Sequence, residues 1–411
     1  MKINKISILG LGYIGLPLAV ILADKSCKVY GFDKDKKVLE DIKNSKIKIG
    51  EKDLFNKFKS KKVKKNFQIS NKITKSDVYI LAVPTPFNKK ILKPDISAVK
   101  TAINKIIHIL EAGNLIIIES TCPVGTTEII KKIIYKKRSD LKKDSIHISY
   151  CPERILPGNT LKELISNDRI IGGIDPESSK HAKKVYKKFV KGSLNLTNSK
   201  TAEMCKLVEN SYRDVNIAYA NELSIICEKL KIDVWNLIKL ANLHPRVNIL
   251  NPGPGVGGHC IAVDPWFLIS QNLKLTKLIK SARNVNDYKI KWVIKQIKNI
   301  IKKKNQKKNK LFTLGFFGLT YKADSNDIRE SPSFKIVKHF SKNKKLKVIV
   351  YEPNLNKNEF KSLKINTFNI ADTIRMSNLS IILVNHQKFK KNKFRNLSKN
   401  SLIDISGLLQ T

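Results

Sequence analysis

Residues 6–15 read Ile6-Ser7-Ile8-Leu9-Gly10-Leu11-Gly12-Tyr13-Ile14-Gly15, and this stretch sets the fold of the N-terminal part of the chain. Its first four residues predict a short buried strand, because they form an apolar run bounded by glycine. Leu16 to Lys25 predicts a helix. Pro17 is compatible with it, because a proline is tolerated in the first turn of a helix. Lys28 to Phe32 predicts a second strand, which ends at Asp33. The order strand, glycines, helix, strand and acid indicates a β-α-β unit.

The three glycines have the spacing of a dinucleotide-binding turn. The first permits the tight turn, the second lets a pyrophosphate approach the backbone, and the third lets helix and strand pack closely. The helix N-terminus offers N–H groups and a positive dipole to the phosphates. Asp33 lies 18 residues after Gly15, where a carboxylate can bind ribose hydroxyls and repel a 2′-phosphate. We therefore expect Gly10, Gly12, Gly15 and Asp33 to bind NAD rather than NADP.

Hydroxyl residues follow two more predicted strands, Val78 to Val83 and Leu115 to Glu119. Ligands of open α/β sheets bind at the carboxyl ends of strands, so Thr85 and Thr121 are candidates to touch cofactor or substrate. Alternatively, these hydroxyls cap the helices that follow.

A further strand is predicted at Ile146 to Tyr150, and it leads into Pro152-Glu153-Arg154-Ile155-Leu156-Pro157-Gly158. Glu153 and Arg154 are adjacent at a strand end and lie between prolines, which is typical of a site. An ordinary surface ion pair is the alternative, and taken on their own these two residues favour it.

The middle of the chain, Thr201 to Leu230, predicts one long helix because it has helical periodicity without proline or glycine. Lys206, Asn210 and Arg213 lie at i, i+4 and i+7 and so project from one face. A solvated face is one interpretation. In the other, the face is partly buried, and the lysine can hydrogen-bond an oxyanion or exchange a proton.

Residues 252–266 contain one cysteine after four glycines and two prolines, so Cys260 lies in a loop rather than on a helix or strand. A thiol in such a loop can reach a substrate as a nucleophile. If Asp264 begins a short helix, it lies one turn beyond Cys260. The alternative is a glycine-rich turn that holds a buried structural cysteine.

The last part of the chain predicts a second α/β unit. Lys289 to Lys310 is an amphipathic helix, which we interpret as a connector between domains rather than a membrane-surface helix. Lys322 and Arg329 are candidates for phosphate or carboxylate contacts. Strands are predicted at Leu311 to Phe317, Lys347 to Tyr351, Ser380 to Val384 and Ser401 to Ile405.

The fold class predicted is α/β, with two Rossmann-like doubly wound parallel-sheet domains joined by a central helical region that contains one long helix. The predicted divisions are an NAD-binding domain at 1–198, a central helical and dimerisation region with the cysteine loop at 199–308, and a C-terminal nucleotide-binding domain at 309–411. A length of 411 residues agrees with two or three domains.

Composition argues against several classes of function. The formal charge of +45 comes almost entirely from lysines spread along the chain, whereas a nucleic-acid reader concentrates basic residues on one face. The six cysteines show no paired spacing, which indicates free thiols and a cytoplasmic, reducing compartment. No apolar run is long enough for a membrane span. No metal site is predicted.

The motifs resemble the nucleotide-sugar 6-dehydrogenases, which include UDP-glucose and GDP-mannose dehydrogenases, along essentially the whole chain. They are G-L-G-Y-I-G, S-T-C-P-V-G-T-T, E-M-C-K-L-V-E-N, G-G-H-C-I-A-V-D and K-A-D-S-N-D-I-R-E-S-P. Within the family, residues 152–158, 167–173, 244–248 and 258–266 are most similar to the branch that oxidises UDP-N-acetyl-D-mannosamine. UDP-glucose dehydrogenases typically have a lysine where Val263 stands. The chain departs from its branch after Asp33, where lysines replace a frequent arginine.

The resemblance implies a four-electron oxidation of a C6 hydroxymethyl group to a carboxylate, with two NAD⁺ consumed, in surface polysaccharide synthesis. Cys260 would capture the aldehyde as a thiohemiacetal and then hold a thioester. Lys206 would stabilise the oxyanion with help from Asn210. Asp264, Glu153 and Thr121 would orient or activate water. Alternatives are oxidation of UDP-N-acetylglucosamine or UDP-glucose, and a non-catalytic Rossmann protein that binds sugar nucleotides or nucleic acid.

The same resemblance implies two sets of binding residues and a homodimer formed through the central helix. The UDP-sugar would meet Arg154, Ile155, Lys206, Asn210, Arg213, His244, Arg246, Gly257, Tyr321 and Lys322. NAD would also meet Tyr13, Ile14, Thr85, Thr121 and Arg329.

Overall fold

The computed structural model describes residues 3–47, 51–88, 91–142, 144–155, 158–304, 311–389, 394 and 401–410. The chain forms two compact units. The first comprises Met1–Glu209 and Trp266–Gln271, and the second Asn210–Pro265 and Asn272–Thr411. The division between the two units falls inside the helix α9 (Ser199–Leu230). The presence of α9 confirms the long helix predicted from periodicity. The three-part division at 198 and 308 stays a prediction.

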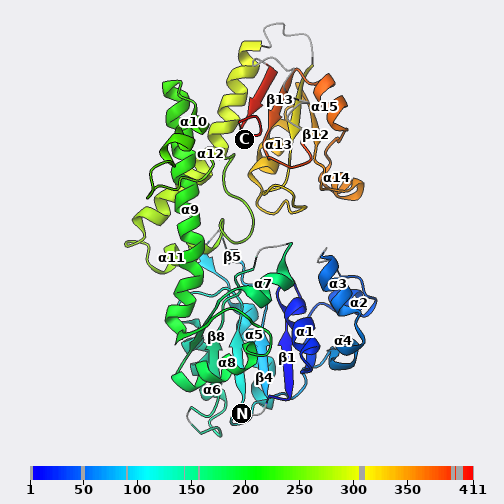
Figure 1. The fold of residues 1–411 in the computed structure, drawn as a ribbon, viewed down its shortest axis with the longest axis vertical. Coiled ribbons are helices and arrows are strands. Elements are labelled where there is room, and N and C mark those ends of the chain that lie inside the picture. The colour runs from blue at the N-terminus through cyan, green and yellow to red at the C-terminus, as the bar shows by residue number, and fades with distance from the viewer. Residues whose placement is uncertain are drawn as a thin grey trace. The chain divides into compact units, whose positions relative to one another are not determined.

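The first unit is built on an eight-stranded sheet in the order β10-β9-β8-β7-β4-β1-β2-β3. Its strands β1, β4 and β8 are labelled in Figure 1. Neighbouring strands run parallel except β8 and β9, which pair antiparallel. The strands are β1 Lys5–Leu9, β2 Lys28–Phe32, β3 Phe67–Ser70, β4 Val78–Leu81, β7 Leu115–Ile118, β8 His147–Tyr150, β9 Arg169–Gly173 and β10 Leu194–Asn198, with β5 Phe87–Asn88 and β6 Lys93–Pro94 forming a separate hairpin.

Helices cover both faces of this sheet, because successive strand side chains point to opposite sides. On β4, Val78 and Ile80 pack in one apolar cluster and Tyr79 and Leu81 in another. The first cluster includes most of α1, and the second includes the apolar side of α5. The helices are α1 Gly15–Asp24, α2 Lys36–Lys43, α3 Lys52–Phe58, α4 Lys61–Asn66, α5 Ser97–Ile106, α6 Thr126–Lys137, α7 Thr160–Ser166 and α8 Pro176–Tyr186, with a 3₁₀ turn at Ile107–Ile109.

The second unit contains a four-stranded parallel sheet in the order β12-β11-β13-β14. Its two inner strands, β11 and β13, are buried throughout. The strands are β11 Phe312–Phe317, β12 Leu346–Tyr351, β13 Leu379–Ile382 and β14 Leu402–Asp404, and the helices are α10 Val234–Ala241, α12 Lys277–Lys304, α13 Pro332–Ser341, α14 Lys357–Leu363 and α15 Ile370–Met376. The remaining helix, α11 (Asp264–Gln271), begins in this second unit and continues into the first.

The elements predicted from the sequence are present, but the prediction was incomplete. No strand was predicted for β3, β5, β6, β9 or β10, and no helix for α2 to α8 or α13 to α15. The antiparallel β8–β9 pairing was not predicted either. The helix predicted at Lys289 to Lys310 begins at Lys277, and residues 305–310 lie outside the described part of the chain. Within the described residues, no helix is long and apolar enough to cross a membrane.

Candidate active site

The turn between β1 and α1 has the geometry that its glycines predict. Gly10 has φ +95° and donates its N–H to the carbonyl of Phe32 at 2.8 Å. A Cβ on Gly15 would overlap the carbonyl oxygen of Gly10, so helix and strand pack too closely here for a side chain. A Cβ on Gly12, by contrast, would meet no described atom within 4 Å. The turn therefore leaves open space beside Gly12, where the fingerprint places the pyrophosphate.

Asp33 closes this turn from the end of β2. Its Oδ2 accepts the N–H of Leu11 at 2.8 Å, and its Oδ1 accepts the N–H of Asp35 at 2.9 Å. An ionised carboxylate has about four acceptor positions. The half-buried carboxylate thus keeps capacity for ribose hydroxyls after these two bonds. Together with the space beside Gly12, these residues fit NAD.

Two alanine substitutions separate the roles of these glycines. We expect Gly12→Ala to fold with an unchanged melting temperature but to bind NAD at least about tenfold more weakly, because the new methyl group occupies ligand space. Gly15→Ala should instead lower the melting temperature, since its Cβ meets backbone. Thermal unfolding and NAD titration of both variants check this. Normal NAD affinity in Gly12→Ala would contradict the assignment.

The loop after β7 is fixed by a residue that sequence reasoning missed. Glu203 on α9 is fully buried and accepts the N–H groups of Gly125 at 2.5 Å and Thr127 at 2.8 Å. The Thr127 hydroxyl donates to the same carboxylate at 2.7 Å. Glu203 therefore satisfies the N-terminus of α6 and holds the loop that contains Thr121. Thr121 itself is half-buried, as is Thr85 after β4.

Lys206 and Glu153 lie together in the first unit. Lys206 is only 8% exposed, and its Nζ donates to the backbone carbonyl of Glu153 at 2.5 Å. Burial raises the pKa of Glu153 to about 7, although the charges of Lys206 and Arg169 act in the opposite direction. Its carboxylate accepts the N–H of Ile155. A carboxyl with this pKa can exchange protons near neutral pH. Leu156 and Pro157 lie outside the described residues.

Asn210 lies one turn after Lys206 on α9, and it also is 8% exposed. Its Nδ2 donates to Asp264 Oδ2 at 2.6 Å. Asp264 is the first residue of α11, and its N–H donates to the carbonyl of Cys260 at 2.8 Å. The prediction that Asp264 begins a helix one turn beyond Cys260 is confirmed. Cys260 is half-buried, unlike the fully buried Cys122 and Cys151.

The cysteine loop rests on the segment that follows β11. Gly258 donates its N–H to the carbonyl of Arg329 at 3.0 Å. A Cβ on Gly258 would lie 2.9 Å from the ring of Tyr321, and one on Gly257 would lie 2.7 Å from the Tyr321 Cβ. Tyr321 therefore packs against the glycines just before Cys260.

A chain of buried hydrogen bonds holds the start of the cysteine loop, at Gly253. Gly253 donates its N–H to Asn221 Oδ1 at 2.9 Å, and Asn221 Nδ2 donates to Asn286 Oδ1 at 2.8 Å. Asn286 in turn donates to Asp214, which pairs with the buried Arg283 at 2.6 Å. These residues join α9 to α12 and fix where the loop begins. Sequence reasoning missed them, because the pairs are far apart in the chain.

The other predicted substrate residues lie in more open positions. Arg154 pairs with Glu209 at 2.9 Å. Ile155 is partly buried, whereas Arg213, His244, Arg246 and Lys322 are exposed. Among the predicted NAD residues, Tyr13 donates to Glu51 at 2.9 Å, Ile14 is the N-cap of α1, and Arg329 pairs with Asp327 at 2.6 Å.

A dinucleotide-binding turn, a second Rossmann-like unit, and a loop cysteine one turn before an aspartate that an asparagine holds are the features of a nucleotide-dependent dehydrogenase. The UDP-glucose/GDP-mannose dehydrogenase family matches this chain in three parts: its NAD binding domain at residues 4–190, its central domain at 200–288 and its UDP binding domain at 315–411. The chain belongs to this family and is an NAD-dependent nucleotide-sugar dehydrogenase.

Individual relatives extend the likeness over the full length. UDP-N-acetyl-D-mannosamine dehydrogenase of Escherichia coli (strain K12) is 42% identical, over 99% of this chain and 100% of that protein. NDP-N-acetyl-D-galactosaminuronic acid dehydrogenase of Ralstonia solanacearum is 40% identical, over 98% and 96%. The solved structure of UDP-N-acetyl-mannosamine dehydrogenase from Staphylococcus aureus is 37% identical with a TM-score of 0.85, over 99% and 96%.

Proposed function

We propose that the chain oxidises UDP-N-acetyl-D-mannosamine at C6 to UDP-N-acetyl-D-mannosaminuronate, and that the acid serves surface polysaccharide synthesis. The observation that supports this most is the combination of a half-buried Cys260 one turn before Asp264 with full-length similarity to enzymes of that name. All six cysteines are free, which supports a reaction in the reducing cytoplasm.

Two NAD⁺ would each accept one hydride, one in each oxidation, held by Gly10, Gly12, Gly15 and Asp33. Tyr13, Ile14, Thr85, Thr121 and Arg329 are proposed as further NAD contacts. The proposed substrate contacts are Arg154, Ile155, Arg213, His244, Arg246, Gly257, Tyr321 and Lys322.

Cys260 allows the second oxidation. An aldehyde has no hydroxyl group from which a second oxidation can start, so its carbon must first become tetrahedral. The sulfur of Cys260 adds to the carbonyl carbon and forms a thiohemiacetal. Oxidation of this adduct leaves the acyl group on the sulfur as a thioester. Water then adds to the thioester carbon, which releases the carboxylic acid and restores the thiol.

Lys206, Asn210 and Asp264 act around this carbon. The ammonium group of Lys206, which is 8% exposed, stabilises the oxyanion in each tetrahedral state, because negative charge develops on that oxygen. Asn210 supports it by hydrogen bond, while its own contact with Asp264 keeps the amide oriented. Asp264, Glu153 and Thr121 orient the water that hydrolyses the thioester, and Glu153 takes its proton.

A substrate panel tests the proposal. Purified protein is assayed with UDP-linked N-acetylmannosamine, N-acetylglucosamine, N-acetylgalactosamine and glucose, and NADH is counted per sugar consumed. We expect two NADH per molecule and turnover mainly with the N-acetylmannosamine nucleotide. The runner-up is N-acetylgalactosamine, because relatives named for its acid are 40% identical. Turnover with UDP-glucose alone would refute the choice of sugar.

The raised pKa of Glu153 predicts how acid formation depends on pH. If its carboxylate takes the proton from water, thioester hydrolysis should rise with pH until about 7 and then level off. Glu153→Gln should remove this rise, whereas Glu128→Gln, at an exposed ion pair with Lys200, should keep it. The measurement is the rate of acid release in single turnover from pH 5 to 9.

Stability provides an independent check on the same group. Because the pKa of Glu153 in the folded state lies above its ordinary value of 4.5, its ionisation destabilises the fold as pH rises from 4.5 to about 7. Glu153→Gln should therefore unfold at a higher temperature than the wild type at pH 8, and the difference should disappear at pH 4. An equal difference at both pH values would contradict the raised pKa.

We also propose that the chain forms a homodimer through α9. Six exposed apolar side chains lie on this helix, and at 3.6 residues per turn they fall within about 80° of arc. They are Met204, Val208, Tyr212, Tyr219, Ile226 and Leu230. A second copy of the chain, with the same apolar stripe, is the occupant that fits it.

Light scattering tests this contact. The wild type should have the mass of two chains, and Tyr219→Glu should have the mass of one. Ile129→Glu on α6 is a matched control, because Ile129 is another exposed apolar residue at 42%. A monomeric wild type, or dissociation in the control as well, would refute the proposed interface.

A further inference from the structure

The turn after β11 repeats the backbone geometry of the NAD-binding turn after β1. Gly10 has φ +95° and donates its N–H to Phe32, the last residue of the neighbouring strand, at 2.8 Å. Gly318 has φ +93° and donates to Tyr351, again the last residue of the neighbouring strand, at 3.0 Å. The two turns therefore leave their sheets in the same way.

An acid then closes both turns from the same place. Leu11 donates its N–H to Asp33, directly after β2, at 2.8 Å. Leu319 donates its N–H to Glu352, directly after β12, at 2.7 Å. Glu352 is thus the counterpart, in the second unit, of the acid that meets the ribose in a dinucleotide fold.

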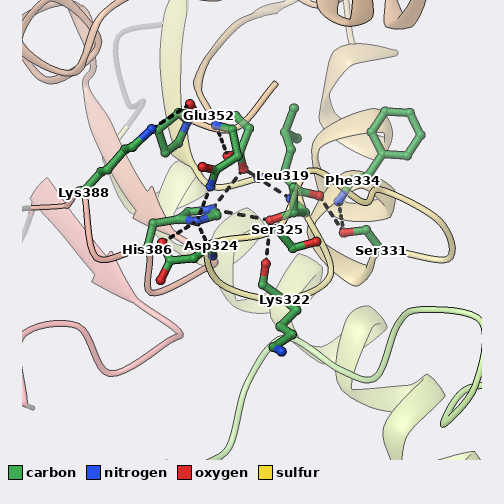
Figure 2. Close-up of polar contacts among 12 residues, drawn as sticks. Leu319, Lys322, Asp324, Ser325, Ser331, Phe334, Glu352, His386 and Lys388 are labelled. Carbon is green, nitrogen blue, oxygen red and sulfur yellow. Dashed lines mark hydrogen bonds and ion pairs between the residues drawn. The ribbon is translucent and has the colours of Figure 1, made fainter. Parts of the chain in front are cut away.

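Glu352, however, has no capacity left for a ligand. Its Oε2 accepts from Leu319, from Thr320 at 3.3 Å and from His386 Nε2 at 3.0 Å. Its Oε1 accepts the N–H of Asn354 at 2.9 Å. Three of these donors converge on Oε2, and the side chain is 0% exposed, so no ligand can reach the carboxylate. The carboxylate is directed at the protein's own backbone (Figure 2).

His386 covers this acid and reaches the far end of the same loop. The ring is 0% exposed, and its Nδ1 accepts the N–H of Asp324 at 3.0 Å. A backbone N–H can only donate, so the ring proton lies on Nε2, which donates to Glu352. Burial raises the pKa of Glu352, but bonds from His386 and backbone N–H groups outweigh it and lower that pKa. The carboxylate therefore stays ionised as an acceptor.

The loop between these contacts carries two proposed substrate residues, Tyr321 and Lys322. The Thr320 hydroxyl donates to the carbonyl of Lys322 at 2.8 Å, and Tyr321 donates its N–H to Asp327 at 3.1 Å. The Lys322 side chain points away from the Glu352–His386 pair (Figure 2). The pair thus fixes the backbone and leaves the lysine free to project from the loop.

We propose that Glu352 and His386 are positioning residues for the nucleotide: they hold the Leu319–Asp324 loop so that Tyr321 and Lys322 bind the uridine diphosphate of the substrate. The second unit has kept the acid of a dinucleotide turn but uses it to shape the loop. This inference rests on the proposed function, because it assigns the loop to the UDP-sugar site.

Binding of UDP itself to the full-length protein tests the inference. Glu352→Ala should weaken UDP binding at least tenfold in calorimetry and leave NAD affinity within twofold. Glu352→Gln, which keeps one oxygen acceptor, should recover part of the loss. Asp404→Ala is the matched control, because Asp404 is the last residue of β14 in the same sheet and accepts backbone N–H groups, from Ser406, Gly407 and Leu409. It should leave UDP affinity unchanged.

The outcomes separate this inference from the proposed function. If the wild type binds no UDP, the proposed function fails. If the wild type binds UDP and Glu352→Ala binds it equally well, only the positioning role fails. If UDP affinity falls as much in Asp404→Ala as in Glu352→Ala, the effect is general destabilisation and the inference is overturned. Should Glu352→Ala not fold, Glu352→Gln must still lose UDP affinity at unchanged NAD affinity.

Discussion

Replacing Cys260 with serine should stop the reaction after the first oxidation. Acid formation is expected to fall about a thousandfold or more, because a serine hydroxyl is a far weaker nucleophile toward the aldehyde than a thiol. The substrate would then yield at most one NADH instead of two. Both quantities can be followed in one experiment, with NADH measured by absorbance and the sugar products separated by chromatography.

Cys205→Ser is the control for this substitution. Cys205 and Cys260 are the two partly exposed thiols of the chain, and the other four are buried. The control should keep wild-type stoichiometry, since Cys205 lies on a regular helix and not in the glycine-rich loop. Full oxidation to the acid by Cys260→Ser would show that no covalent sulfur intermediate forms, and the mechanism proposed for this chain would be wrong.

The fold could be predicted where the apolar pattern of the sequence matches the residues that are buried in the structure. The β1–α1–β2 unit is an example, because its apolar runs and glycines are contiguous in the sequence. The strands β3 and β10 were missed because both lie at sheet edges and carry exposed or half-exposed residues. The first half of α12 was missed for another reason. It buries Arg283 and Asn286, and Lys289 directly after the missed part is buried too. An apolar periodicity does not detect buried polar side chains.

Those three polar residues are buried because each finds a partner on α9. Arg283 pairs with Asp214, and Lys289 donates to Ser224 at 2.6 Å. Desolvation lowers the pKa of Lys289 to about 7, so its burial is costly without that contact. The burial of this face of α12 therefore depends on partners that are far apart in the sequence. A single sequence does not reveal such pairs.

In the candidate site, too, local spacing predicted some features, and contacts between distant segments decided the others. Helical spacing correctly placed Lys206 and Asn210 on one buried face of α9. It also placed Arg213 there, yet that side chain is exposed, since spacing gives a direction but not what covers the face. Residues that position the loops, such as Glu203 and Glu352, could not be predicted, because their roles depend on backbone groups of distant segments.

Lys206→Met should lower kcat by about a hundredfold to a thousandfold, the range typical for loss of one group that stabilises an oxyanion. The substitution should also raise the pKa of Glu153 above about 7, because the Lys206 charge is the largest influence that lowers it. The rise of acid release with pH should therefore move to higher pH. Lys200→Met provides the control, since Lys200 is exposed on the same helix and pairs only with Glu128 among the ion pairs described. A kcat within threefold of wild type, or an unmoved pH profile, would mean that the buried ammonium group acts neither on the oxyanion nor on Glu153.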